Sequence, residues 1–162
     1  MEFKRPIPIN ELTEIVIGLC IKIHSRVGPG CFERVYEEIL YYELTQSGLY
    51  VKRQVLLPIN YDELYIKDAY KIDLIIEDKL IVELKSKHPL PPVDFNQVHT
   101  YLFLTNLKHG LLINFKVPKM KEGIHRVYNN FGKVKREIRA GATPGAGISR
   151  CPLSTGGTRT LR

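Results

Sequence analysis

Two acidic residues and a lysine, Asp73, Glu83 and Lys85, stand within a predicted β-hairpin. The flanking chain is rich in Ile, Leu and Val and is interrupted by a polar turn at 77–79, which predicts two antiparallel strands. If the residues on either side of that turn face each other, Asp73 falls directly opposite Glu83. Two carboxylates beside an ammonium group are suited to bind Mg²⁺ or Mn²⁺ with a built-in charge partner.

The apolar residues of the hairpin favour this register. With Ile76 opposite Leu80, Ile75 lies opposite Ile81, and Lys71 lies opposite Lys85 on the polar face. The register places six apolar side chains on the other face: Ile72, Leu74, Ile76, Leu80, Val82 and Leu84. A slip of one residue would put Leu74 opposite Glu83 and disrupt the apolar face.

Such a hairpin has the parts needed for phosphodiester hydrolysis. A divalent cation lowers the pKa of bound water and stabilises charge that develops on a phosphate oxygen. Asp73 and Glu83 would be its ligands, and the main-chain carbonyl of Leu84 can add a third whatever the side chain. Lys85 shares the face of Glu83, so it can hold or activate a water.

A structural interpretation of the same residues stays open. Glu-x-Lys is common on solvated strand faces, and Asp73, Glu83 and Lys85 could form a structural ion-pair cluster. A carboxylate within an Ile- and Leu-rich strand is costly to bury without a partner, and a second carboxylate opposite adds to that cost. We therefore favour a functional site.

Three further residues are candidates for the same site. Glu33, in a predicted helix, is an additional carboxylate that could reach a metal directly or through water. Gln97 and Tyr101 are four residues apart in a later predicted helix and so share one face. They could orient a water, contact a phosphate or position Lys85.

The elements that must position these residues follow from periodicity and breakers. Helices are predicted over 10–27, with Asn10 as the cap, and over 31–47 and 94–107. Strands are predicted over 50–61, 64–67, the hairpin 70–85, and 111–115, with a short strand or turn at 124–128. This order predicts an α/β sandwich with a mixed sheet.

The formal net charge of +7 is concentrated at the end of the chain. Residues 1–130 hold 17 Lys+Arg and 16 Asp+Glu, whereas residues 131–162 hold 7 and 1. We expect a domain over 1–132 and a basic, disordered tail over 133–162, since Gly, Ala, Ser, Thr and Pro dominate from Ala140. A nearly neutral body argues against a large duplex footprint, and suggests a homodimer, a partner subunit, or a small or single-stranded substrate.

Composition also bears on location. The three cysteines, Cys20, Cys31 and Cys151, show neither metal-ligand spacing nor a disulfide framework, which fits a reducing compartment. The early apolar run is too short to span a bilayer. We expect a soluble intracellular protein, cytoplasmic or nucleoid-associated, with no membrane partner.

Read together, four motifs resemble the GxxExxY protein family, a compact branch of the PD-(D/E)xK nuclease superfamily. The motifs span roughly residues 10–130: Gly28-Pro29-Gly30-Cys31-Phe32-Glu33-Arg34-Val35-Tyr36, the hairpin Asp73…Glu83-Leu84-Lys85, Gln97-x-x-x-Tyr101 and Leu111-Leu112-Ile113-Asn114-Phe115. The resemblance implies a restriction-endonuclease-like α/β/α sandwich with a central mixed sheet. Lys116 departs from the family pattern, where Gly more often follows Asn-Phe.

The resemblance also implies roles. Asp73, Glu83 and the Leu84 carbonyl would hold Mg²⁺ or Mn²⁺ with Glu33, and Lys85, Glu33, Gln97 and Tyr101 would serve catalysis. The leading hypothesis is a metal-dependent nuclease or nuclease-like phosphodiesterase acting on DNA or RNA, with DNA favoured. The alternative is a non-catalytic nucleic-acid-binding or regulatory module that retains the nuclease fold.

Overall fold

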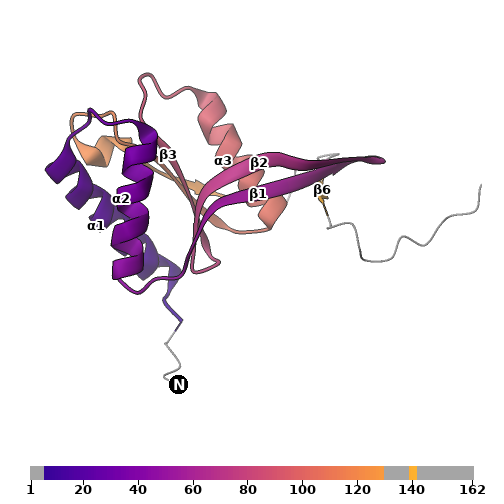
Figure 1. Ribbon diagram of the computed structural model, residues 1–162, viewed down its shortest axis with the longest axis horizontal. Coiled ribbons are helices and arrows are strands. Elements are labelled where there is room, and N and C mark those ends of the chain that lie inside the picture. Colours follow the sequence, from indigo (N-terminus) through magenta and orange to yellow (C-terminus); the bar gives the residue numbers. More distant parts are fainter. Residues whose placement is uncertain (1–5, 130–138, 142–162) are drawn as a thin grey trace, which may run out of the picture.

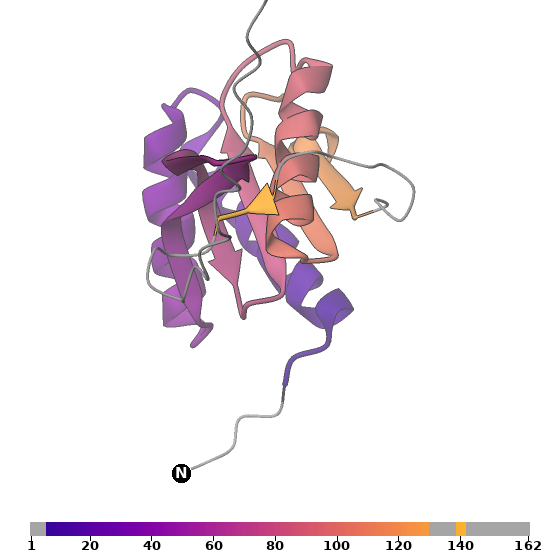
Figure 2. The ribbon, with the colours of Figure 1, turned by 90° about the vertical axis from the view of Figure 1, so that its right-hand side faces the viewer.

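The computed structural model describes residues 6–129 and 139–141. Within these residues, six strands form one mixed sheet in the order β5-β4-β3-β2-β1-β6. Helices α1 and α2 cover one face of the sheet and α3 covers the other (Figures 1 and 2). The molecule is therefore a mixed α/β sandwich of the restriction-endonuclease-like kind, as predicted.

The elements follow the chain in this order: α1 (Ile9–Val27), α2 (Glu33–Gln46), β1 (Val51–Tyr61), β2 (Leu64–Ile76), β3 (Leu80–Lys85), α3 (Pro92–Thr105), β4 (His109–Asn114), the 3-10 helix η1 (Met120–Gly123), β5 (Ile124–Tyr128) and β6 (Arg139–Ala140). Strands β3 and β4 are parallel, from Leu80 opposite His109 to Lys85 opposite Asn114. Helix α3 makes the crossover between them, as parallel neighbours require. The other strand pairs are antiparallel.

Two apolar layers hold the helices to the sheet. The first lies under α1 and α2, whose buried side chains recur at helical spacing: Leu12, Val16, Cys20 and Ile23, then Tyr36, Leu40 and Leu44. The second lies under α3 and contains Val98, Tyr101 and Leu102, packed on Ile81 and Leu112 of the sheet. Cys20 is a free, buried thiol of the first layer, as its place on the predicted helix stripe indicated.

Helix starts were the least accurate predictions. Helix α1 begins at Ile9 with Pro8 at the N-cap, so Asn10 lies inside the first turn and the prediction that it caps the helix is wrong. Helix α2 begins at Glu33 because Phe32 has extended backbone angles and is itself the N-cap. The segments predicted as 64–67 and 70–76 are one continuous strand, β2. Its pairing with β1 shifts register between Leu57 and Ile59.

The predicted register of the central hairpin is confirmed next to the turn, but the ladder stops before the predicted pairs of Ile72 with Leu84, Asp73 with Glu83 and Lys71 with Lys85. Strands β2 and β3 pair Leu74 with Val82, Ile75 with Ile81 and Ile76 with Leu80. The prediction that six apolar residues share one face is wrong for Ile72. That side chain packs in the second layer, whereas Leu74 packs in the first. The physical reason is a break in the alternation of β2 at Asp73, described below.

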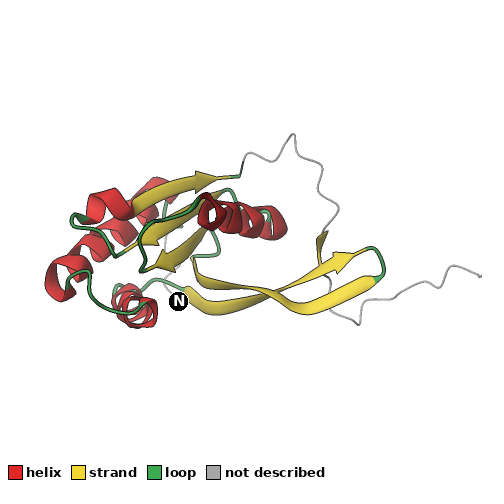
Figure 3. Ribbon diagram, turned by 90° about the horizontal axis from the view of Figure 1, so that it is seen from above, coloured by secondary structure: helices red, strands yellow, loops and turns green. Residues whose placement is uncertain are grey.

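Beyond the hairpin, β1 and β2 continue as a two-stranded ribbon that projects from the body (Figures 1 and 3). Its outer edge pairs with β6 through Ile59 with Ala140 and Asn60 with Arg139. Arg139 and Ala140 belong to the segment 133–162 that we predicted as a disordered tail, so that prediction does not hold for these two residues. Residues 130–138 and 142–162, including Cys151, lie outside the described residues. None of the helices in the described part of the chain is long and apolar enough to cross a membrane.

Candidate active site

A cleft of about 590 Å³ lies where β1 and β2 leave the body and β3 ends. Its lining is almost wholly polar: Glu33, Arg34, Glu37, Glu38, Arg53, Gln54, Lys71, Asp73, Glu83, Lys85 and Gln97. We call it the Glu83 cleft. The fold thus brings together Glu33, Asp73, Glu83, Lys85 and Gln97 of the predicted site, from the four elements α2, β2, β3 and α3. Tyr101, the remaining predicted side chain, is buried next to Gln97.

Asp73 and Glu83 sit where the ladder between β2 and β3 stops. The last ladder pair is Leu74 with Val82, and beyond it the Leu84 N–H donates to Asp73 Oδ2 at 2.9 Å. On the neighbouring strand, Lys85 Nζ donates to Glu83 Oε1 at 2.7 Å. Because β2 and β3 no longer pair beyond Leu74 and Val82, the Asp73 and Glu83 carboxylates both face the same cleft.

Glu83 is only 2% exposed, and its Oε2 atom is buried without a hydrogen-bond partner among the described residues. Burial first, and then the charge of Asp73, raise the pKa of Glu83 to about 7, although the hydrogen bond and charge of Lys85 oppose the shift. Burial also raises the pKa of Asp73, although the Leu84 N–H opposes that shift. Asp73 and Glu83 thus have too little positive charge nearby for both carboxyl groups to be ionised favourably at the same time.

Lys85 is buried as well, yet it stays a cation. Burial by itself would lower the pKa of Lys85, but the hydrogen bond and charge of Glu83, with the charges of Glu33 and Asp73, raise it above the ordinary value. At neutral pH the side chain is therefore a protonated donor.

The loop before α2 positions Glu33. Tyr36, one turn further along the helix, donates its hydroxyl hydrogen to the Gly28 carbonyl and accepts the Cys31 N–H at 3.1 Å. Its ring stacks on Phe115 with centroids 4.2 Å apart. Because one buried side chain binds both ends of the loop, Tyr36 fixes the path of the chain that leads into Glu33.

Ser86 ties this loop to β3. Its hydroxyl donates to the Cys31 carbonyl at 2.7 Å, and its main chain acts to lower the pKa of Glu33. Burial raises the pKa of Glu33, while the charge of Lys85 lowers it and that of Asp73 raises it. Glu33 therefore faces the same charges as the hairpin residues.

Gln97 and Tyr101 share one face of α3, as predicted, and bind each other. Gln97 Nε2 donates to the Tyr101 hydroxyl at 2.6 Å, and that hydroxyl donates to the Lys71 carbonyl at 2.9 Å. Burial raises the pKa of Tyr101, so the phenol stays protonated. Tyr101 thus anchors β2 two residues before Asp73, and only Gln97 of this pair lines the cleft.

Three residues that we did not predict, Glu37, Arg53 and Gln54, form a network at the edge of the cleft. Arg53 Nε donates to Glu37 Oε1 at 2.6 Å, and both terminal nitrogens of Arg53 donate to Glu38 at 2.8 and 2.6 Å. Gln54 Nε2 donates to Glu37 Oε2 at 2.8 Å and lies 3.5 Å from Asp73 Oδ1. The sequence offered a signal for Glu37 alone, which follows Glu33 by one helical turn.

A sequence model of the PD-(D/E)XK nuclease superfamily matches residues 10–127. The chain belongs to this superfamily. The match contains every residue predicted for the site, and it establishes a nuclease-like domain. No significant match was found among curated proteins or among solved structures.

Nucleases of this superfamily generally use divalent metals, so the residues of the cleft can be tested for fit. In the ranges 6–129 and 139–141, no three or more His, Cys, Asp and Glu side chains are grouped so as to hold an ion. Asp73 and Glu83 are nevertheless hard oxygen donors in one cleft, and the buried Glu83 Oε2 has an unused acceptor. The donor set therefore fits Mg²⁺ or Mn²⁺, and Glu33 lines the same cleft.

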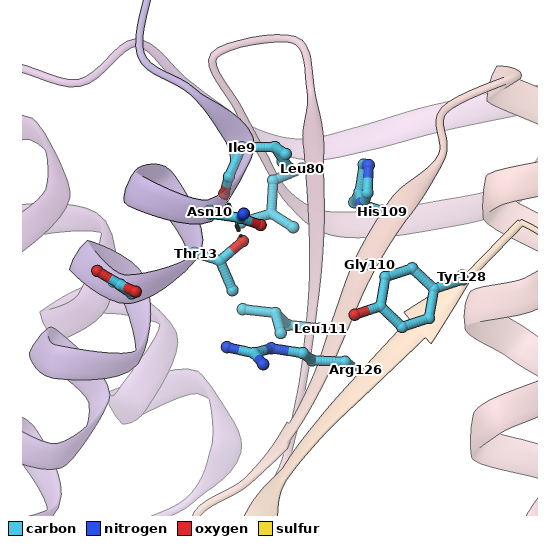
Figure 4. A pocket seen from close by; sticks show the side chains of 10 residues that line it. Ile9, Asn10, Thr13, Leu80, His109, Gly110, Leu111, Arg126 and Tyr128 are labelled. Carbon is cyan, nitrogen blue, oxygen red and sulfur yellow. Dashed lines mark hydrogen bonds between the residues drawn. The ribbon is translucent and has the colours of Figure 1, made fainter.

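A second cavity, of about 290 Å³, lies between the start of α1 and the strands β4 and β5 (Figure 4). It opens near Leu80 and His109, the first residues of the parallel strands, whereas the Glu83 cleft lies at the other end of β3. The Thr13 hydroxyl in its wall already donates to the Ile9 carbonyl at 2.7 Å. None of the predicted nuclease residues lines it.

Proposed function

We propose that this protein is a metal-dependent nuclease or nuclease-like phosphodiesterase of the GxxExxY branch, acting on DNA or RNA, with DNA favoured. The observation that carries the proposal is the buried cluster of Asp73, Glu83 and Lys85 in a polar cleft, where Glu83 Oε2 has no hydrogen-bond partner within residues 6–129 and 139–141. Two buried carboxylates against one ammonium leave negative charge that a divalent cation would neutralise.

Asp73 and Glu83, with the main-chain carbonyl of Leu84, would hold Mg²⁺ or Mn²⁺, and Glu33 would support it from the rim. When bound there, the cation would stabilise charge on a phosphate oxygen and make a nearby water more acidic. Leu84 would then act twice, because its N–H already orients the Asp73 carboxylate.

Lys85 would act as a hydrogen-bond donor and a positive charge. Its raised pKa keeps the ammonium protonated at neutral pH, which argues against a role as general base. From its place 2.7 Å from Glu83, it can orient an attacking water or neutralise the phosphate. Gln97 lines the same wall and would support that water, while Tyr101 holds Gln97 in place.

Arg34 and Lys71 also line the Glu83 cleft and supply the positive charge that a phosphate backbone needs. The folded body is otherwise close to neutral. We therefore favour a short or single-stranded nucleic acid, or a complex in which a second copy or a partner subunit contributes further contacts.

The test is cleavage of labelled single- and double-stranded DNA and RNA with Mg²⁺ or Mn²⁺. Wild type is compared with Asp73→Ala and Lys85→Ala, and with Asp68→Ala as a control on the exposed ribbon. Loss of cleavage in the first two variants alone would support the proposal and identify the substrate class. Cleavage that persists in both would contradict it. Mn²⁺ binding without cleavage of any substrate would instead favour the non-catalytic nucleic-acid-binding or regulatory module.

A further inference from the structure

We propose that Gln54 is a positioning residue that orients the Asp73 carboxylate, and that Glu37 and Arg53 hold Gln54 in place. Nothing in the superfamily match assigns a role to these three residues. The inference rests on the proposed function, since the orientation of Asp73 matters only if the Glu83 cleft binds a cation.

The first observation is a strained backbone. Gln54 has a φ of 51°, in the left-handed region that side chains other than Gly, Asn and Asp rarely adopt. It lies within strand β1, between the ladder pairs Arg53 with Leu74 and Val55 with Ile72, so it stands opposite Asp73. Such strain persists only where the surrounding structure enforces it, and it gathers at functional sites.

The strain has a visible consequence in both strands. On β2, Leu74 packs in the first apolar layer and Ile72 in the second. On β1, Val51 packs against the first layer and Val55 against the second. Regular alternation would keep the two members of each pair on one face. In both strands the side chains therefore switch from one face of the sheet to the other, β1 at Gln54 and β2 at Asp73. The side chains of Gln54 and Asp73 line the cleft.

The second observation is the network that holds the Gln54 amide. Its Nε2 donates to Glu37 Oε2 at 2.8 Å, and the other oxygen of Glu37 accepts Arg53 Nε at 2.6 Å. Glu37 is only 6% exposed, so its carboxylate has little freedom to turn. Arg53 is fixed in turn by two hydrogen bonds to Glu38. The amide nitrogen of Gln54 is thereby directed into the cleft.

These contacts orient the Asp73 carboxyl group without placing a positive charge beside it. One oxygen, Oδ2, accepts the Leu84 N–H, and the other, Oδ1, lies 3.5 Å from Gln54 Nε2, at the limit of a hydrogen bond. A neutral amide at that distance restrains rotation of the carboxylate without neutralising it. A Lys or Arg in the place of Gln54 would compete with a cation for the same charge.

Substitution of Gln54 by Gly separates positioning from stability. Gly adopts a positive φ without strain, which offsets the lost hydrogen bond to the buried Glu37, so Gln54→Gly should keep the melting temperature in EDTA within about 4 °C of wild type. Loss of the amide should weaken Mn²⁺ binding by about tenfold, which is the lower end of the affinity losses seen when a residue that orients a metal ligand is replaced. Binding is measured by titrating Mn²⁺ against the melting temperature, and the Mn²⁺ dependence of cleavage should shift by the same factor.

Two further variants sharpen the test. Asp62 has the same φ of 51° at the tip of the ribbon, so Asp62→Gly relieves the same kind of strain far from the cleft and should leave Mn²⁺ binding unchanged. Gln54→Asn also tolerates a positive φ, but its side chain is one methylene too short to reach both carboxylates. It should therefore bind Mn²⁺ as weakly as Gln54→Gly.

The outcomes distinguish this inference from the proposed function. If wild type gains no stability from Mn²⁺, the proposed function fails, and the inference with it. If wild type gains stability and Gln54→Gly binds Mn²⁺ equally well, only the inference is wrong. If Gln54→Gly melts well below wild type in EDTA, the residue serves the fold and the inference is also overturned.

Discussion

Lys85 Nζ lies 2.7 Å from Glu83 Oε1, whereas Glu83 Oε2 accepts no hydrogen bond from any side chain or main chain in the described ranges. One oxygen of the buried Glu83 carboxylate thus accepts a hydrogen bond, and the other does not. A structural ion pair would be expected to use both oxygens, because a buried acceptor without a partner costs free energy. Asp94, in its ion pair with Lys87, also has a buried oxygen without a partner in these ranges, so what distinguishes the Glu83 cluster is the second buried carboxylate, Asp73, in the same cleft.

Removal of the Lys85 ammonium should show how much the buried negative charge of Asp73 and Glu83 destabilises the fold. In Lys85→Met the side chain keeps its length but leaves Asp73 and Glu83 without a cation. We expect the free energy of unfolding in EDTA at pH 8 to fall by about 3 kcal/mol, as when one partner of a buried ion pair is deleted. Urea unfolding measures this change. Lys52→Met, which removes an exposed ion pair with Asp78, is the control and should cause no measurable loss. An equal loss in both variants would contradict the view that Lys85 neutralises a buried cluster.

The substitution Asp73→Asn should move stability and metal binding in opposite directions. It removes one of two neighbouring negative charges while the amide oxygen can still accept the Leu84 N–H. We expect the free energy of unfolding without metal to rise by about 1 kcal/mol, as is common when a functional charge is removed. The increase in melting temperature that Mn²⁺ gives wild type should disappear. A variant that is less stable than wild type but keeps the Mn²⁺ effect would show that Asp73 serves the fold.

The local parts of this site were predictable, and the long-range parts were not. The register of the hairpin depends on a short turn and on apolar alternation, both contained in residues 74–82, and it was confirmed. Glu33 and Tyr36 belong to one of the motifs on which the family resemblance rests, so both were named from the sequence. The role of Tyr36 as a clamp for the loop was not visible, because its partners include Phe115, far along the chain.

The change of face at Asp73 could not be foreseen for the same reason. It depends on a left-handed backbone at Gln54, nineteen positions away in the chain, where the residue type gives no hint of a positive φ. The network from Arg53 to Glu37 likewise joins a strand to a helix through tertiary contact. Alternation rules assume a regular strand, so they assigned Ile72 to the wrong face.

Stability without metal should fall as the pH rises through neutrality. The pKa of Glu83 is raised to about 7 in the folded protein, mainly by burial, against about 4.3 in the unfolded chain. Between these values the folded state binds a proton that the unfolded state does not, so this group's contribution is fully present below about pH 4 and is lost as the pH passes 7. Between pH 5.5 and 8.5 the loss should be on the order of 2 kcal/mol.

Melting temperatures in EDTA from pH 5.5 to 8.5 measure this dependence. The slope should be reduced in Glu83→Gln, which has no proton to lose. Since protons and Mn²⁺ would compete for the same oxygens, the stabilisation of wild type by Mn²⁺ should increase over the same range. A pH profile that is identical in wild type and Glu83→Gln would refute the assignment.

Tyr36→Phe should weaken activity more than stability. The ring can still stack on Phe115, but the hydroxyl that binds Gly28 and Cys31 is lost. We expect a loss of about 1 kcal/mol in the free energy of unfolding, as for a hydrogen-bonded hydroxyl. Because the released loop leads directly into Glu33, cleavage should fall at least about tenfold, by analogy with residues that orient metal ligands. Tyr42→Phe, on the exposed side of the same helix, should change neither quantity. If Tyr36→Phe loses stability but cleaves at the wild-type rate, the loop does not control Glu33.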